Sequence, residues 1–381
     1  MNCSGINPAT NEEIAVSFGE QIDSVEPLLS PANERVYVAP GWIDIQVNGF
    51  GGVDYNSPTA SHESIAQSIR LLFSTGVTRF FPTVITGSAD DMTGALRNLA
   101  SARESLAEGP AMEAFHVEGP YISPEDGPRG AHPRRWVRPP DLNEFQRFQD
   151  AARGNIRLIT ISPDWPETPR FIENVVRRGV VASIGHTGAS AEQISAAVSA
   201  GATLSTHIGN GAHSTLSRHP NYIWDQLADD RLAASVIVDG IHLGKSFLNV
   251  ALRAKGSERA ILVTDAVMPA GCNPGRYKLG EVDVELHADG SVRLLGGTRL
   301  AGSALRMDHA IRNVMKLAGL SLREALAMAT VNPARIGRVA SRLRGLNPGE
   351  RADLVRFRYS PDTREVQVLE TYLNGVNVYA A

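Results

Sequence analysis

The apolar residues of the chain fall into a regular series of short runs, separated by amphipathic stretches. Most of these runs lack strict alternation of polar and apolar positions, which is typical of strands buried on both faces of a parallel sheet. Between them the pattern predicts helices, for example over 62–74, where Ile65, Ile69 and Leu72 share one face. Eight runs are predicted as strands: Trp42–Val47, Thr78–Val84, Glu113–Glu118, Arg157–Ile161, Val180–Gly185, Leu204–Ile208, Ser235–Asp239 and Ile261–Thr264.

Eight strands that alternate with helices predict an α/β fold, either a closed parallel barrel or an open doubly wound sheet. The length from Gly41 to about Arg338 suits the roughly 250 residues, plus insertions, of a (β/α)8 TIM-type barrel. No Gly-x-Gly-x-x-Gly motif follows the first strand, which disfavours a dinucleotide-binding sheet. We therefore expect the barrel.

Short β-type segments occur at both ends of the chain, in 13–18 and 35–38 and again in 352–357 and 365–369. We expect residues 1–40 and 345–381 to form one small β-sandwich domain beside a barrel of residues 41–344. Within the barrel, about 273–300 is predicted to form a β-hairpin insertion, with a turn at Asp289–Gly290.

The composition argues against some classes of protein but does not distinguish among the others. Of the 381 residues 43% are hydrophobic and 20% charged, with a net charge of −4, so no general basic field attracts nucleic acid or anionic lipid. No apolar run approaches the ~20 residues of a membrane span. The two cysteines, Cys3 and Cys272, and an N-terminus without a signal-peptide pattern favour a cytoplasmic protein. An anionic small substrate would need a local cationic pocket.

Polar residues follow five of the eight predicted strands, and in such barrels the chemistry lies at the C-terminal ends of the strands. One histidine or aspartate at a strand end ordinarily satisfies a turn, but five in register predict a site. They stand in the segments His116-Val-Glu118, Gly185-His186, Thr206-His207, Asp239-Gly-Ile-His242 and Thr264-Asp265.

Glu118, His186 and His207 are the residue types that bind Zn²⁺ or Fe²⁺, and three protein ligands leave positions open for water and substrate. Asp265 is placed to take a proton from the attacking water and to return it to the leaving amine; a further metal ligand is the alternative role for this carboxylate. His132 lies in a loop rich in glycine and proline, which indicates a binding loop rather than core.

Together these motifs resemble the N-acetylglucosamine-6-phosphate deacetylase family of the amidohydrolase superfamily, over nearly the whole chain. The resemblance implies a hydrolase of amino-sugar catabolism or cell-wall sugar recycling. It is carried by 40–49, 116–121, 130–132, 185–186, 206–210, 239–242, 264–266, 300–303 and 332–334, and by 349–355, which the superfamily shares more widely.

The resemblance implies roles for single residues. Glu118, His186 and His207 would bind one divalent metal ion, Asp265 would transfer the proton, and His132 would contact the reacting acyl group. Many superfamily members carry His-x-His after the first strand, where this chain has Gln46-Val-Asn48. Neutral amides are poor ligands for a second ion, so a single metal is expected.

The resemblance further implies a substrate-binding set, in which His242 contacts the sugar phosphate. Arg218, eleven residues after His207, would grip the phosphate across the interface of a homodimer; a surface or interface salt bridge is its alternative role. The stretch 209–216 departs from the family pattern, although the backbone N–H groups near Asn210 and Gly211 could still bind phosphate. Leu300 and Ser303 complete the set, whereas His213 and His219 are expected on a surface loop.

Other functions stay open at this point. The same chemistry could act on the galacto epimer, on an unphosphorylated acetylamino sugar or on another N-acyl substrate. A cyclic amidohydrolase normally uses a carboxylated lysine, and no lysine stands at a predicted strand end. A catalytically inactive sugar-binding protein is the alternative from another class, and the intact set of Glu118, His186, His207 and Asp265 argues against it.

Overall fold

A closed parallel barrel forms the larger part of the molecule, in a computed structural model that describes residues 1–28, 35–339 and 345–381. The predicted boundary at 344 lies outside these residues. Hydrogen bonds join eight strands in the order β14-β13-β12-β11-β10-β9-β8-β5. The expected (β/α)8 fold is confirmed. The strands are β5 (Trp42–Val47), β8 (Val77–Ile85), β9 (Phe115–Glu118), β10 (Ile156–Ile161), β11 (Val181–Ile184), β12 (Leu204–Ser205), β13 (Ala233–Val236) and β14 (Ala260–Leu262).

The barrel closes between its first strand and the segment that follows its last. Val47 and Ala266 form a parallel bridge, the Asp265 N–H donates to Gln46 O at 3.0 Å, and the Asn48 N–H donates to Ala266 O at 2.7 Å. All six residues of β5 are buried, the polar Asp44 and Gln46 included, as expected of a strand that is covered on both faces.

Helices surround the barrel, and several of them begin at a residue whose side chain caps the first turn. Ser61, Ser88 and Asp141 accept hydrogen bonds from the first turns of their helices, and Ser190 and Gln193 form a reciprocal capping box. The helices are α1 (His62–Phe73), α2 (Ala89–Ser105), α3 (Leu142–Ala151), α4 (Thr168–Arg177), α5 (Ala191–Ser199), α6 (Tyr222–Ala228), α7 (Lys245–Arg259), α8 (Met307–Ala318), α9 (Leu322–Ala327) and α10 (Val331–Ile336), with 3-10 turns at Gly109–Ala111 and Arg134–Trp136.

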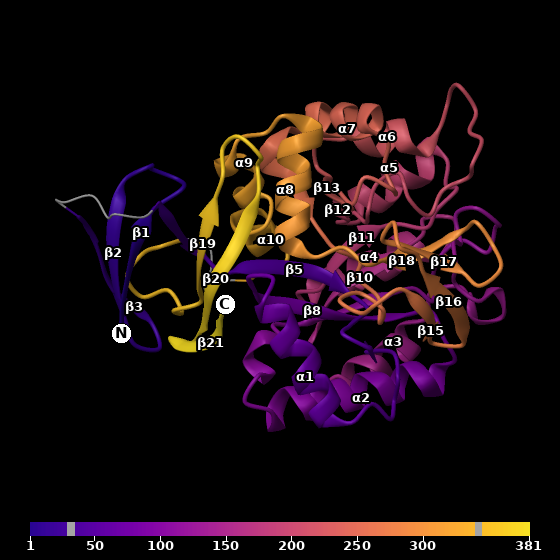
Figure 1. Cartoon of the computed structure of the whole chain (residues 1–381). Helices are drawn as coiled ribbons and strands as arrows, with labels where there is room; N and C mark the ends of the chain where they lie inside the picture. The colour runs from indigo at the N-terminus through magenta and orange to yellow at the C-terminus, as the bar shows by residue number, and fades with distance from the viewer. Residues whose placement is uncertain (29–34, 340–344) are drawn as a thin grey trace.

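Both ends of the chain join a separate seven-stranded sheet of order β21-β20-β19-β4-β1-β2-β3. Indigo and yellow strands lie side by side there, at the end of the barrel away from the insertion (Figure 1). A buried ion pair between Arg79 of β8 and Asp353, with 2.7 Å between Nε and Oδ2, fastens this sheet to the barrel. The strands are β1 (Asn2–Ile6), β2 (Glu13–Phe18), β3 (Ile22–Pro27), β4 (Val36–Pro40), β19 (Leu354–Tyr359), β20 (Val366–Leu373) and β21 (Val376–Ala380).

The insertion is a four-stranded antiparallel sheet, so the expected hairpin gains one strand on each side. β16 (Val282–Leu286) and β17 (Ser291–Leu294) form the hairpin, and β15 (Gly275–Leu279) and β18 (Leu300–Ser303) flank it. The Gly280 N–H donates to Asp54 Oδ2 at 2.7 Å, just after the short β6 (Gly49–Phe50) and β7 (Val53–Asp54) pair. This contact holds the insertion over the C-terminal ends of the barrel strands, where Figure 1 shows it.

None of the helices in the described part of the chain has the length and apolar character needed to cross a membrane.

Candidate active site

Three of the predicted site residues lie where the backbone turns sharply at a strand end. His186, His207 and Asp265 have φ values of 51°, 30° and 50°, in the left-handed region that residues other than glycine rarely adopt. Each such residue costs on the order of 1–3 kcal/mol, and such backbone conformations cluster at functional sites. The barrel therefore holds these three side chains in place at the expense of local strain.

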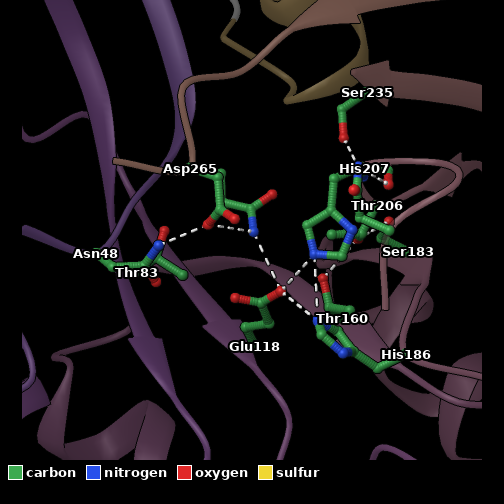
Figure 2. A network of polar contacts seen from close by, with 12 residues as sticks. Asn48, Thr83, Glu118, Thr160, Ser183, His186, Thr206, His207, Ser235 and Asp265 are labelled. Carbon is green, nitrogen blue, oxygen red and sulfur yellow. Dashed lines mark hydrogen bonds and ion pairs between the residues drawn. The ribbon is translucent and has the colours of Figure 1, made fainter. Parts of the chain in front are cut away.

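The predicted metal ligands meet at one point (Figure 2). Glu118 Oε1 lies 3.0 Å from His186 Nε2 and 3.0 Å from His207 Nε2, and the two Nε2 atoms are 3.2 Å apart. All three residues are buried, and among the described residues they are the group whose ligand atoms could hold a metal ion. Segments up to 89 positions apart along the chain thus converge.

The donor set fits a divalent cation. His186 Nδ1 lies 2.8 Å from Pro128 O, so a proton on Nδ1 would leave the Nε2 lone pair for a cation that replaces the Nε2 proton at the centre. Burial opposes ionisation of Glu118, but the hydrogen bonds from His186 and His207 outweigh it and hold the pKa of the carboxyl well below its usual value. An ionised carboxylate and two imidazoles are the ligands that Zn²⁺ and Fe²⁺ accept.

Asp265 lies next to this centre, and two amides hold one of its oxygens. Asn48 Nδ2 donates to Asp265 Oδ1 at 2.7 Å and Gln46 Nε2 donates to the same oxygen at 3.1 Å. Gln46 Nε2 also donates to Glu118 Oε1 at 3.1 Å, so one amide group joins Asp265 to a predicted metal ligand. Burial and the nearby Glu118 charge raise the pKa of Asp265 to about 6, which suits a group that accepts and returns a proton near neutral pH.

His132 packs beside the predicted ligands, with its ring centroid 4.5 Å from that of His186. Burial, with the neighbouring His186, lowers the pKa of His132 to about 3, so the imidazole is neutral. His132 Nδ1 is buried and has no hydrogen-bond partner among the described residues. Nδ1 is thus an unsatisfied polar atom of a residue that lines the cavity described next.

A cavity of about 900 Å³ opens onto these groups. Besides the metal ligands, Asp265 and His132, it is lined by four of the six predicted substrate-binding residues, namely His242, Asn210, Gly211 and Leu300. His242 Nδ1 lies 2.5 Å from Asp239 Oδ2, which fixes the imidazole ring.

The other two predicted substrate-binding residues do not line the cavity of the single chain. Ser303 is buried and its hydroxyl donates to Thr264 O at 2.5 Å, so it braces the turn that carries Asp265. Arg218 lies on an exposed loop. Its predicted role across a dimer interface stays a prediction.

Sequence reasoning missed four residues, three that line the cavity and one, Gln46, beside it. Gln46 and Asn48 were considered only as poor ligands for a second metal, whereas both hold Asp265. His213, expected on the surface, lines the cavity and lies 3.2 Å from Glu125 Oε2 through its Nε2. Arg299, just before Leu300, also lines it. The sequence signal for Gln46 and Asn48 was their position at the end of the first strand, where polar residues face the site.

The chain belongs to the amidohydrolase family, whose model matches residues 37–378. This superfamily consists of metal-dependent hydrolases, which agrees with the buried cluster of Glu118, His186 and His207. The sequence is 33% identical over 354 residues to N-acetylglucosamine-6-phosphate deacetylase of Bacillus subtilis (strain 168), covering 92% of this chain and 87% of that protein. It is 31% identical over 338 residues to N-acetylgalactosamine-6-phosphate deacetylase of Escherichia coli O157:H7, covering 88% and 87%.

Solved structures agree with these sequence relatives. N-acetyl-D-glucosamine-6-phosphate deacetylase from Mycobacterium smegmatis superposes with a TM-score of 0.89 at 28% identity and covers all of both chains. A mutant of that enzyme, in complex with N-acetyl-D-glucosamine-6-phosphate, superposes with a TM-score of 0.87 at 29% identity, over 97% of this chain and 95% of the other. The resemblance to the deacetylases is thereby confirmed.

Proposed function

We propose that this protein removes the acetyl group from N-acetylglucosamine 6-phosphate by hydrolysis. The observation that carries the proposal is the convergence of Glu118, His186 and His207 on one point beside Asp265, in a cavity large enough for a sugar phosphate. The named relatives act on N-acetylated amino-sugar phosphates. The products are acetate and the amino-sugar phosphate.

Glu118, His186 and His207 would hold one divalent metal ion, Zn²⁺ or Fe²⁺. When bound, this ion supplies Lewis-acid activation of the acyl carbonyl and of the attacking water. The chain's own contribution is to fix the three ligand atoms, since Gln46 braces Glu118 and the Pro128 carbonyl fixes the His186 ring.

Asp265 transfers the proton. Its Oδ1 atom accepts hydrogen bonds from both Gln46 and Asn48, so Oδ2 is the oxygen that takes the proton from the attacking water. The protonated carboxyl then donates to the amide nitrogen as the C–N bond breaks. His132 is neutral and contributes an N–H to the developing oxyanion.

Substrate recognition is assigned to the far wall of the cavity. His242, held by Asp239, and the backbone N–H group of Gly211 face the sugar phosphate. Asn210 lines the same wall, but its N–H already donates to His207 O at 3.0 Å. Arg218 joins them from the partner subunit of a cytoplasmic homodimer. Binding energy from this distant group orients the amide at the reacting centre.

A substrate panel tests the proposal. Acetate release is followed for N-acetylglucosamine 6-phosphate, for its galacto epimer and for the unphosphorylated sugars, with metal-replete wild type and Asp265→Asn. We expect turnover of the gluco 6-phosphate and a loss of orders of magnitude in the variant while its metal content stays the same. Normal turnover by Asp265→Asn would remove the proton-transfer role.

The galacto epimer is the second candidate substrate, because the Escherichia coli relative of that name is nearly as similar as the deacetylases for the gluco sugar. A higher kcat/KM for N-acetylgalactosamine 6-phosphate would transfer the proposal to that sugar. If metal-replete protein binds either sugar phosphate tightly but releases no acetate, the alternative of a catalytically inactive sugar-binding protein would be favoured.

A further inference from the structure

The large cavity holds very little permanent positive charge for a site that is to take a phosphorylated substrate. Arg299 is the one lysine or arginine among the described residues that line it. Carboxylates line it as well, from Asp54, Asp91, Asp126 and Glu281 in addition to the catalytic groups. An oxyanion that enters this cavity is repelled by the carboxylates, so a fixed cation has a strong effect there.

Arg299 lies close to the predicted metal centre, although it comes from the insertion sheet. Its Nη1 atom donates to Gly130 O at 3.4 Å. Gly130 lies beside the His186 ring, since a Cβ added to this glycine would come within 3.3 Å of His186 Cε1. Arg299 forms no ion pair within 4.0 Å in the described chain, although its charge, like that of Arg134, acts on the Asp126 carboxylate that Arg129 holds.

Arg299 also belongs to a second, adjoining pocket of about 450 Å³. Three more arginines line this pocket, Arg129, Arg134 and Arg135, against the single carboxylate of Glu281. Arg129 is paired with Asp126 and Arg135 with Glu281, whereas Arg134, like Arg299, forms no ion pair within 4.0 Å in the described residues. Buried Arg129 Nε is a donor without a hydrogen-bond partner in the same part of the chain.

We propose that Arg299 and Arg134 form a small-oxyanion subsite beside His132, separate from the phosphate-binding wall of His242 and Asn210. Its ligand is a phosphate or carboxylate group that accepts N–H bonds from a guanidinium. The role of this subsite in catalysis rests on the proposed function. The proposed reaction provides both kinds of anion, because the substrate carries a phosphate and the product acetate is a carboxylate. Anion binding at the subsite does not depend on catalysis.

Direct binding tests the subsite without catalysis. Inorganic phosphate and acetate are titrated separately by calorimetry into metal-free protein, so that neither anion can bind a metal ion. The proteins are the wild type, Arg299→Ala, Arg134→Ala and the control Arg293→Ala, whose arginine lies on β17 of the same sheet but lines neither pocket. We expect Arg299→Ala to weaken binding of at least one anion roughly tenfold, Arg134→Ala to weaken the same anion, and Arg293→Ala to bind as the wild type.

Kinetics then separate the two sources of the anion. If the phosphate of the substrate lies in this subsite rather than at the wall of His242, Arg299→Ala raises KM for the phosphorylated sugar and leaves KM for the unphosphorylated sugar unchanged. If it takes the carboxylate, the inhibition constant for acetate rises and both KM values stay the same. Unchanged affinity for both anions in Arg299→Ala, or equal losses in Arg293→Ala, would overturn the subsite. A wild type that binds an anion through Arg299 but releases no acetate would overturn the proposed function alone.

Discussion

Removal of the amide that holds Asp265 should shift the pH dependence of catalysis by a definite amount. The change is Asn48→Ala, which deletes the 2.7 Å hydrogen bond from Nδ2 to Asp265 Oδ1. Asn48 is buried, and its other side-chain atom, Oδ1, has no hydrogen-bond partner in the described chain, so the substitution removes one specific interaction and little else.

The magnitude follows from the state that the hydrogen bond favours. An N–H donor stabilises the ionised carboxylate, and a hydrogen bond to a charged group contributes about 1.5–3 kcal/mol. One pKa unit corresponds to about 1.4 kcal/mol, so the pKa of Asp265 should rise by about 1–2 units. Burial and Glu118 already raise this pKa to about 6 in the wild type. The variant therefore needs a higher pH to ionise its proton acceptor.

The assay is kcat/KM for acetate release as a function of pH, with bound metal measured at each pH. We expect the acidic limb of the Asn48→Ala profile to lie about 1–2 units above that of the wild type. Asn98→Ala is the matched control, because Asn98 Nδ2 donates at 2.8 Å to the neutral Ala60 carbonyl, away from the site. An acidic limb at the wild-type position, or one shifted to lower pH, would refute the role given to Asn48.

Three further outcomes are expected. Glu118→Gln should bind divalent metal more than roughly tenfold more weakly, measured by competition with a chelator, because a neutral amide replaces the anionic ligand; undiminished affinity would contradict the ligand assignment. Burial raises the pKa of Asp44 to about 7 from 3.8, so the folded state binds this proton more tightly and the free energy of unfolding should fall as pH rises from about 4 to 7. In urea unfolding, the decrease in unfolding free energy between pH 4 and 7 should be smaller in Asp44→Asn than in the wild type, by on the order of 4 kcal/mol. An equal decrease in both proteins would exclude Asp44 as its source. Asp353→Ala should destabilise the fold by about 3 kcal/mol in the same urea assay, since it removes the fully buried partner of Arg79 and leaves this guanidinium the pair with Glu113 at 3.3 Å; unchanged stability would contradict this role.

The barrel could be predicted from the sequence because its strands are buried on both faces. That burial produces mostly apolar runs such as Ala260–Leu262 with the following Val263, which pattern alone can recognise. β15 and β18 escaped prediction, since they are only five and four residues long and each contains a glycine, which is depleted in strands. Their pairing depends on the hairpin between them, a long-range contact that no local pattern reports.

The positions of the predicted ligands could be anticipated because the C-terminal ends of parallel strands converge. The left-handed backbone at His186, His207 and Asp265 could not, since these residue types adopt it only where the surrounding fold imposes it. Gln46 has no charge and no motif of its own, and its bridge between Glu118 and Asp265 emerges only from the closure of the barrel. Arg299 reaches the cavity from a sheet that the sequence placed but could not orient.

The central claim is that Glu118, His186 and His207 together hold one metal ion beside Asp265. Anomalous diffraction from crystals of metal-loaded protein, recorded on either side of the absorption edge of the bound metal, tests it most directly. We predict one strong peak within bonding distance of Glu118 Oε1, His186 Nε2 and His207 Nε2. A peak elsewhere in the barrel, or none at this point in protein that releases acetate, would contradict the account.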